Sequence, residues 1–522
     1  MRARNSYRLE AFAGENNTDS LTNQAVFGRQ GGMFSRLRNF HLIGVGKARK
    51  RYGYKKYNAA QVAGSSSPIQ GVAMYEFGPT RLLVIVVNGQ VRVFNEGAGT
   101  FSNITGTLSL TAGQNVLSRF GSFNDGTNRY LMGANGTDAP WAYAGSGNAV
   151  TLDSISTGPL PAGTCLGLME FHGYLLFLTA NSLAYAAYGT LDWINGGTLD
   201  GPRDPIAVGM AQHSRDVALI FYQSRQVYRL EFNPLQGSTW RMLPVDGSEG
   251  CISKTSIITK DGYTYYAGLR GIFRIGDPER GATFIGRAIE TFWGTLNRSR
   301  RIYVTAVDRG EPWNEIMWLV SSDASGVSTA QNDCLIVWNT QLKGWTIFPV
   351  ASTAGKLNFN CGANWIDSSD LPHTIMGGYD GYLYDAFGHQ LVDTSYADDG
   401  ATITTQCKTG FLNYGYPGVT GQREIIIDGE FPSEITLNIT VQAMGKNPKT
   451  KSKIIQAGGD ELDVDFILDE SVLSETGPQQ EHIDFPADAR YLCTTIEESN
   501  NNVPHALISL DFPHVRKGLY AA

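Results

Sequence analysis

A short extended hairpin recurs along this chain at a nearly even spacing. In the clearest copy, at 81–94, an apolar strand meets an Asn-Gly turn and an alternating strand follows. Asn-Gly and Asp-Gly supply the positive φ angles that tight hairpins need. Looser copies are found at 129–143, 172–188, 217–230, 263–275, 315–338 and 374–385. Their starts lie about 43 to 60 residues apart, which is the spacing of four-stranded propeller blades.

Composition agrees with an all-β fold. Sixty Gly, 24 Tyr and 24 Phe, with only 17% charged residues, are typical of a turn-rich aromatic β protein. Long stretches with apolar residues at i, i+3, i+4 and i+7 are nearly absent, so few helices are expected. We therefore predict a β-propeller of six or seven blades over residues 68–400.

The two ends of the chain do not follow the blade spacing. Residues 1–67 are predicted to be an extended basic arm with one or two strands, ordered mainly against something else, and they end in a Gly-Ser-Ser-Ser-Pro linker. Residues 401–522 are predicted to form a smaller antiparallel, sandwich-like β domain, because 423–428 and 435–441 alternate as sandwich strands do. The last strand, at 506–512, is expected to pair with the first blade or with the arm.

Charge is spread unevenly along the chain. Residues 1–57 hold twelve Lys or Arg against three acids, although the net charge of the whole chain is −7. The basic excess of residues 1–57 could simply reflect a solvent-exposed surface. A more specific hypothesis is that this arm docks on an acidic protein or on a nucleic acid. The interleaved Tyr52, Tyr54 and Tyr57 would allow base stacking in the nucleic-acid case. The candidate interaction residues are Lys47, Arg49, Lys50, Arg51, Lys55 and Lys56.

Acidic residues gather instead near the end of the chain. The stretch 423–498 is rich in them, and they include Glu461, Asp463, Asp465, Asp469 and Glu470.

Cysteine usage and targeting signals suggest a chain made in a reducing compartment. The six cysteines are scattered without a CxxC pattern or a nearby histidine, which argues against a zinc site or a disulfide scaffold. The first eight residues lack the apolar region of a secretory signal, and the longest apolar run, at 82–87, is too short to cross a membrane. We expect a protein that is made in a cytosol and stays soluble there or in an assembly.

Sequence patterns for catalysis and for metal or cofactor binding are missing. GxxxxGK, GxSxG, HExxH and the DxDxDG calcium loop do not occur. A degenerate sialidase-type box at 259–265 occurs once and is explained by a hairpin turn at Asp261 and Gly262. We therefore predict no enzyme activity, no catalytic residues, no metal and no cofactor. A receptor- or glycan-binding propeller and a propeller glycosidase remain alternatives, as does a cellular scaffold protein.

The order of several short motifs resembles that of a known family. These motifs are Gly-Gly-Met-Phe-Ser-Arg-Leu-Arg-Asn at 31–39, Arg-Tyr-Gly-Tyr at 51–54, the strand at 69–77, Asp-Gly-Tyr at 261–263 with Gly-Ile-Phe-Arg-Ile at 271–275, and Val-Trp-Asn at 337–339 with Gly-Trp-Thr at 344–346. In this order they are similar to the propeller-containing tail proteins of short-tailed bacteriophages: the tail nozzle, or tail tubular protein B, and related tail-hub proteins.

The resemblance implies a structural virion protein of the phage tail, assembled in the host cytoplasm. Six copies would form a ring below the adaptor ring and the portal, as the distal end of the tail tube. Double-stranded DNA would pass through this ring transiently during ejection, and tail fibre or needle proteins would attach to it. The resemblance supplies no catalytic residues. A tube that conducts DNA should not hold it, so the acidic stretch 423–498 is a candidate lining for the tube, since basic linings bind phosphates. The basic arm would then face an acidic neighbouring subunit, where opposite charges favour assembly.

Overall fold

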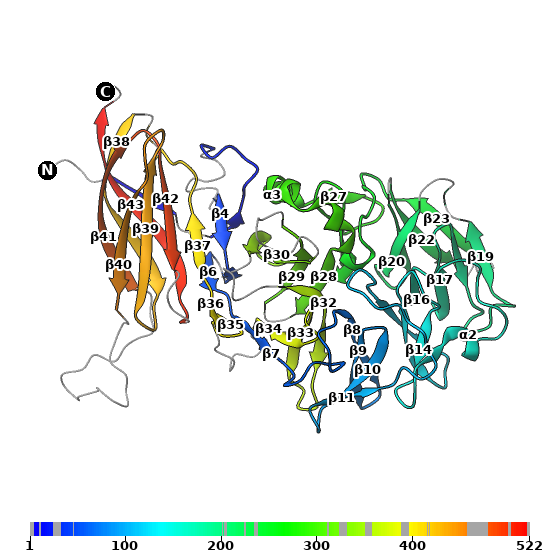
Figure 1. Ribbon diagram of the computed structural model, residues 1–522. Coiled ribbons are helices and arrows are strands. Elements are labelled where there is room, and N and C mark those ends of the chain that lie inside the picture. Colours follow the sequence, from blue (N-terminus) through cyan, green and yellow to red (C-terminus); the bar gives the residue numbers. More distant parts are fainter. Residues whose placement is uncertain are drawn as a thin grey trace.

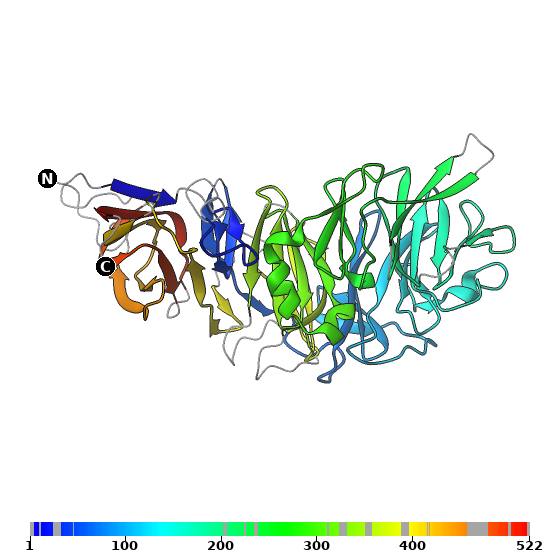
Figure 2. The same ribbon diagram turned by 90° about the horizontal axis from the view of Figure 1, so that it is seen from above.

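The computed structural model describes residues 5–9, 12–23, 33–44, 46–200, 202, 206–223, 226–233, 239–310, 313–322, 331–349, 358–387, 396–414, 416, 418–456, 479–498 and 503–518. These residues form two β-rich lobes side by side, and both termini lie at the lobe that ends the chain (Figures 1 and 2). Strands from residues 33–56 run between the lobes (Figure 1).

Seven four-stranded antiparallel units form the larger lobe. In chain order they are β8 (Ile69–Phe77), β9 (Thr80–Val87), β10 (Gln90–Asn95), β11 (Thr100–Asn103); β12 (Arg119–Asn124), β13 (Arg129–Ala134), β14 (Trp141–Tyr143), β15 (Val150–Thr151); β16 (Gly167–Phe171), β17 (Tyr174–Leu178), β18 (Ser182–Tyr185), β19 (Gly197–Asp200); β20 (Ala207–Gln212), β21 (Val217–Tyr222), β22 (Val227–Asn233), β23 (Thr239–Pro244); β24 (Ile258–Lys260), β25 (Tyr263–Ala267), β26 (Ile272–Ile275), β27 (Ala282–Phe284); β28 (Thr305–Gly310), β29 (Glu315–Val320), β30 (Cys334–Asn339), β31 (Gly344–Phe348); and β32 (Phe359–Ile366), β33 (Pro372–Gly378), β34 (Leu383–Ala386), β7 (Tyr54–Lys56).

The units close into a ring. The first strands of the second to seventh units pack against one another in chain order, and β32 of the seventh unit packs against β8 of the first. Between the first two units, Gly71 of β8 lies against the ring of Phe120 of β12. The lobe is therefore a β-propeller with seven blades, and the predicted fold class is confirmed. Short helices connect or cover the blades: α2 (Leu152–Ile155), η2 (Lys254–Ser256), η3 (Gly286–Ile289), α3 (Glu290–Thr295) and η4 (Arg298–Tyr303).

Each of the seven hairpins predicted from the sequence is the central pair of strands of one blade. The copy at 81–94 corresponds to β9 and β10, joined at Asn88 and Gly89 with φ of 50° and 69°. Asp261 and Gly262 make a similar turn between β24 and β25, with φ of 52° and 74°. Asn, Asp and Gly adopt this left-handed backbone conformation more readily than other residues do. The sequence therefore indicates where these turns lie.

The last blade closes with a strand from the start of the chain. β7 lies antiparallel to β34, with Ala386 opposite Tyr54 and Tyr384 opposite Lys56. Residues 1–67 were expected to form an arm with one or two strands that orders against something else. Instead, their described parts contain seven strands, which pack against this chain itself, because their apolar side chains complete both of its cores.

The smaller lobe is a β-sandwich. One sheet has the order β41-β38-β43-β6-β5, with β1 also paired to β43, and the other runs β4-β37-β42-β39-β40. Here β43 pairs with the arm strands β1 and β6, which is one of the two partners expected for the last strand. Bounds are β1 (Asn5–Leu9), β4 (Arg36–Arg38), β5 (Phe40–Ile43), β6 (Lys47–Lys50), β37 (Thr405–Lys408), β38 (Val419–Glu430), β39 (Ile435–Ala443), β40 (Lys449–Ile455), β41 (Gln479–Ala489), β42 (Leu492–Glu498) and β43 (Ala506–Gly518), with the small pairs β2 (Gly14–Glu15) and β3 (Met33–Phe34), β35 (Ala397–Asp398) and β36 (Ala401–Thr402).

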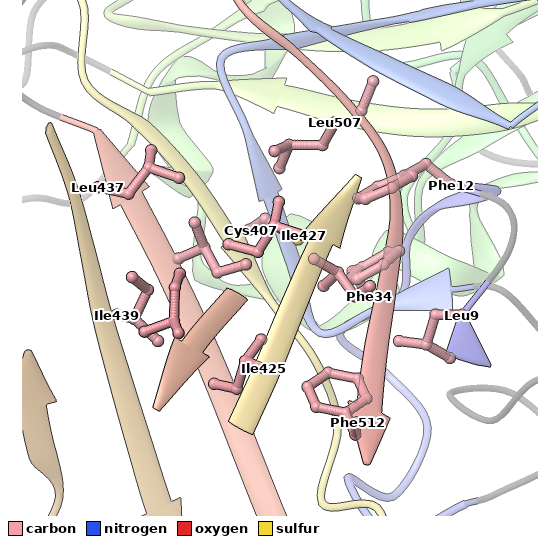
Figure 3. Packing of buried hydrophobic residues seen from close by; sticks show 14 of the residues in the cluster. Leu9, Phe12, Phe34, Cys407, Ile425, Ile427, Leu437, Ile439, Leu507 and Phe512 are labelled. Atoms are coloured by element: carbon pink, nitrogen blue, oxygen red, sulfur yellow. The ribbon is translucent and has the colours of Figure 1, made fainter. Parts of the chain in front are cut away.

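Side chains from both ends of the chain fill the sandwich core. Figure 3 shows Leu9, Phe12 and Phe34 from the first residues beside strand residues such as Ile427 and Phe512. All five side chains are almost completely buried. Since burying one such side chain contributes about 1.5–3 kcal/mol, the arm residues stabilise this lobe substantially.

The two lobes share one sheet. β31 of the sixth blade pairs in parallel with β4 at Ile347 and Arg38, and β4 pairs with β37 of the sandwich. The result is a nine-stranded sheet that runs from the propeller into the sandwich. This sheet couples the two lobes through backbone hydrogen bonds as well as side-chain packing.

Candidate functional site

The six basic residues predicted as interaction residues lie where the chain leaves the sandwich and enters the propeller. Lys47, Arg49 and Lys50 are on β6, Lys55 and Lys56 are on β7, and Arg51 lies between the two strands. At this crossing the backbone of Gly53 approaches Ala397 so closely that a Cβ atom would lie 1.8 Å from the Ala397 carbonyl oxygen. Glycine is therefore the residue that lets the two segments meet there.

Arg51 is the centre of this junction. Its guanidinium is completely buried and contacts Asp398 at both carboxylate oxygens, with distances of 2.7 Å for Nη1–Oδ1 and 2.5 Å for Nη2–Oδ2. Nε donates to the side chain of Asn39 at 2.8 Å, and Nη1 also donates to the Tyr52 carbonyl at 3.0 Å. A planar guanidinium suits this two-point contact, which a lysine could not make.

Lys50 forms a second buried pair with Glu498 of β42. Nζ lies 2.5 Å from Glu498 Oε2, and both side chains are fully buried. Burial lowers the pKa of Lys50, and the charge of Glu498 opposes this shift. The backbone of Lys50 also donates to the carbonyl of His505 at 2.9 Å. Burial beside Lys50 lowers the pKa of His505 to about 3, so this imidazole is neutral at pH 7.

A third buried cluster joins the propeller to β5 and was not predicted. Arg309 Nη1 lies 2.8 Å from Glu315 Oε2 and 2.9 Å from His41 Nε2, and His41 Nδ1 lies 2.9 Å from Glu315 Oε1. Burial and the neighbouring Arg309 lower the pKa of His41 to about 4, against the opposing effect of Glu315. A neutral His41 with its proton on Nδ1 satisfies both contacts. The guanidinium of Arg309 also lies 4.2 Å from the Trp313 ring centroid.

Nothing in the sequence could have indicated this cluster. His41 lies in the arm, while Arg309 and Glu315 flank a hairpin far along the chain. They carry no motif and no characteristic spacing, and only the pairing of distant strands brings them together.

The outer basic residues also face acids of the same chain. Lys47 forms an ion pair with Glu430, and Lys56 lies 3.5 Å from Asp399. Arg49 donates to the Tyr396 hydroxyl at 3.0 Å. The basic arm was expected to face an acidic neighbouring subunit, whereas these ion pairs form with acids of the same chain. A contact of these residues with a neighbouring subunit stays a prediction, but Lys50 and Arg51 are buried and do not reach this molecule's surface.

The prediction that the arm tyrosines stack on nucleobases is contradicted by the positions of Tyr52 and Tyr54. Tyr52 and Tyr54 are buried, with 2% and 5% exposure, in contact with other aromatic rings. The hydroxyl of Tyr57 accepts a hydrogen bond from Trp365 Nε1 at 3.2 Å. Tyr52 and Tyr54 are core residues, so their ring faces are covered. Tyr57 is partly buried beside the rings of Phe94 and His373.

Basic side chains bridge the centre of the propeller. Arg119 of the second blade donates to the carbonyls of Met210 in the fourth blade and Lys254 in η2. Lys254 in turn donates to the carbonyl of Asn135, back on the second blade. Burial lowers the pKa of Arg119 to about 10 and that of Lys254 to about 8. These bonds cross the ring, so DNA cannot thread the middle of a single propeller.

Within the described ranges, other site types were not found. They contain no group of three or more His, Cys, Asp or Glu residues placed to hold a metal ion. No described helix has the length and apolar character needed to cross a membrane. All six cysteines are buried as thiols.

Comparison with known proteins finds similar solved structures but no matching family model. No known protein family matches the sequence, and no curated protein does. Among solved structures, YCF48 bound to a D1 peptide aligns with a TM-score of 0.38 and 16% identity, over 64% of this chain and 97% of that chain. The WD40 propeller domain of Doa1 aligns at 0.39 and 10%, over 64% and 96%. The extracellular domain of BT3049 from B. thetaiotaomicron aligns at 0.40 and 10%, over 62% and 40%.

Proposed function

We propose that this chain is a structural subunit of the distal tail tube, the nozzle or hub, of a short-tailed bacteriophage, and that it acts by assembly rather than by catalysis. The observation that carries the proposal is the fixed connection between its two lobes. A nine-stranded sheet and the buried cluster of Arg309, Glu315 and His41 join the propeller to the sandwich, and the buried Arg51–Asp398 pair lies where the chain crosses between them. A subunit of a ring-shaped conduit needs such a defined shape, because small changes in the angle between lobes would change the ring.

Charge distribution supports a role in which DNA passes without binding. Four of the six residues of the basic cluster are paired with carboxylates of the same chain: Lys47 with Glu430, Lys50 with Glu498, Arg51 with Asp398 and Lys56 with Asp399. Proteins hold DNA chiefly through Lys and Arg contacts with phosphates, and these four side chains are already paired. The propeller centre is bridged as well. A conduit for DNA would therefore lie between subunits of a ring and not inside one propeller.

The proposed partners follow from the same assembly. Copies of the chain would form a six-fold ring that docks on a tail adaptor ring and carries fibre or needle proteins. A ring with one repeated head-to-tail interface needs two different complementary surfaces on each subunit. The two lobes, which differ in fold, offer such surfaces.

Negative-stain electron microscopy tests this proposal. The purified chain would be imaged alone and after mixing with phage tails that lack it. We expect closed rings, or added density at the distal tip of the tails. Chains that stay monomeric at all concentrations and never bind the tails would contradict the proposal. Binding of a labelled DNA duplex, measured by fluorescence anisotropy, should be weak at physiological salt.

A further inference from the structure

A groove on the propeller surface lies between the fourth and fifth blades and η4. It has a volume of about 830 Å³. Its lining includes Ile252, Leu269, Arg270, Arg298, Arg301 and Ile302, and we call it the η4 groove. It lies beside α3, since Arg301 Nη2 donates to the carbonyl of Trp293 at 2.6 Å.

The apolar part of the η4 groove is unusually exposed. Leu269 has 66% of its surface accessible and Ile302 has 48%. Isolated exposed leucines are ordinary, but two large aliphatic side chains at one groove are typical of a site that another chain covers. The groove therefore offers an apolar floor for a partner side chain.

Arginines surround this apolar floor. Arg270, Arg298 and Arg301 line it, against a single carboxylate, Glu249, which Arg270 already pairs. Arg301 is held in place by the carbonyls of Trp293 and Gly294, at 2.6 Å and 3.3 Å. Arg298 is exposed, and within the described part of the chain no acid forms an ion pair with it. The groove thus favours a ligand that combines carboxylates with aliphatic or aromatic side chains.

The same chain contains a segment of that composition. Residues 460–470 read Asp-Glu-Leu-Asp-Val-Asp-Phe-Ile-Leu-Asp-Glu, with six acids, five apolar residues and no base. Over 461–466 acidic and apolar residues alternate strictly. An alternating pattern can present its acids on one side and its apolar side chains on the other when the backbone is extended. This matches a groove with an apolar floor and basic edges.

We propose that the η4 groove binds residues 460–470 of a second copy of this chain. The segment connects β40 to β41, and these strands lie on the side of the sandwich that faces away from the propeller (Figure 1). A neighbouring propeller can approach that side. The contact joins the sandwich of one subunit to the propeller of the next, which is the head-to-tail type of interface that generates rings. The proposal rests on the self-assembly part of the proposed function.

Peptide binding tests the groove directly. A fluorescein-labelled peptide of residues 458–472 is titrated with the full chain in which 460–470 is replaced by a Gly-Ser linker, and anisotropy is recorded. We expect saturable binding that Arg298→Glu weakens at least about tenfold, because the reversed charge faces the peptide carboxylates. Arg280→Glu is the matched control, since Arg280 is 88% exposed and lies outside the groove lining. No binding, or equal losses in both variants, would overturn the proposal.

Cysteine cross-linking tests whether the contact forms between two copies. All six native cysteines are buried, so introduced thiols dominate the reaction. Chains carrying Arg298→Cys are mixed with chains carrying Asp465→Cys and oxidised mildly, and a disulfide-linked dimer of the two is expected. If rings form and the Arg298→Glu variant still assembles without this cross-link, the groove assignment is wrong while self-assembly stands. If the chain never assembles and the peptide does not bind, both proposals fail.

Discussion

Removing the guanidinium of Arg51 should destabilise the junction between the two lobes strongly. Arg51→Met leaves the Asp398 carboxylate in a fully buried position without its two-point partner at 2.7 Å and 2.5 Å. Breaking a buried ion pair from one side costs about 3–5 kcal/mol, because the remaining charge is neither solvated nor compensated. We expect the free energy of unfolding, measured by urea titration of tryptophan fluorescence, to fall by that amount.

A double variant separates the ion pair from the packing of the side chain. Asp398→Asn should also destabilise the chain, but Arg51→Met combined with Asp398→Asn should cost less than the sum of the two single changes. The difference should be at least about 1.5 kcal/mol, the lower range measured for close buried charge pairs. Additive losses would show that the two charges do not act as a pair.

Lys56→Met is the matched control for this experiment. Lys56 belongs to the same basic cluster, but its ion pair with Asp399 spans 3.5 Å and both side chains are about 40% exposed. Exposed pairs contribute about 0–1 kcal/mol, so this variant should unfold almost as the parent does. If Arg51→Met is as mild as Lys56→Met, the argument that burial makes the Arg51 pair essential is refuted.

Three further predictions concern pH, backbone contact and blade closure. In the unfolded chain histidines bind protons near pH 6.5, whereas in the folded chain the pKa values of His41 and His505 are about 4 and about 3, so the free energy of unfolding is highest above pH 6.5 and falls as pH falls. Each histidine should lower the free energy of unfolding by about 2 kcal/mol at pH 5. Urea titrations at pH 7.5 and 5.0, repeated with His505→Asn, would measure this loss. Gly53→Ala should cost more than about 2 kcal/mol, because its Cβ has no room beside the opposing backbone, whereas Gly294→Ala has open space and should be neutral or slightly stabilising in the same titration. Deleting residues 1–57 should prevent folding of the propeller, because blade seven loses β7. Limited proteolysis of the truncated chain should then give no stable fragment of propeller size. A protease-resistant fragment of that size would show that β7 is dispensable.

The blades were predictable because their signals are local. A turn such as Asn88-Gly89 and the alternating strands beside it lie within fifteen residues, and backbone sterics alone select that conformation. The spacing of such hairpins then indicates a propeller. The hairpins alone do not decide between six and seven blades, because the blade count depends on how the ring closes.

The role of the first residues was not predictable in the same way. β7 pairs with β34 and β6 pairs with β43, and the partners in each pair are hundreds of residues apart. A sequence shows that 47–56 is basic, but not that its counter-charges are Asp398 and Glu498 of the same molecule. Long-range strand pairing decides this, and it leaves no periodic signal near the residues concerned.

The strand order of the last blade also determines when the propeller can fold during translation. More than three hundred residues separate β7 from its partner β34, and the sandwich needs β43, later still. At about 5–20 residues per second, β7 waits at least about 15 seconds on the ribosome before a partner exists. The propeller can close only after β34 has been made and the sandwich only after β43 has been made, so complete subunits exist only after translation of β43. Incomplete chains are thereby kept out of any assembly.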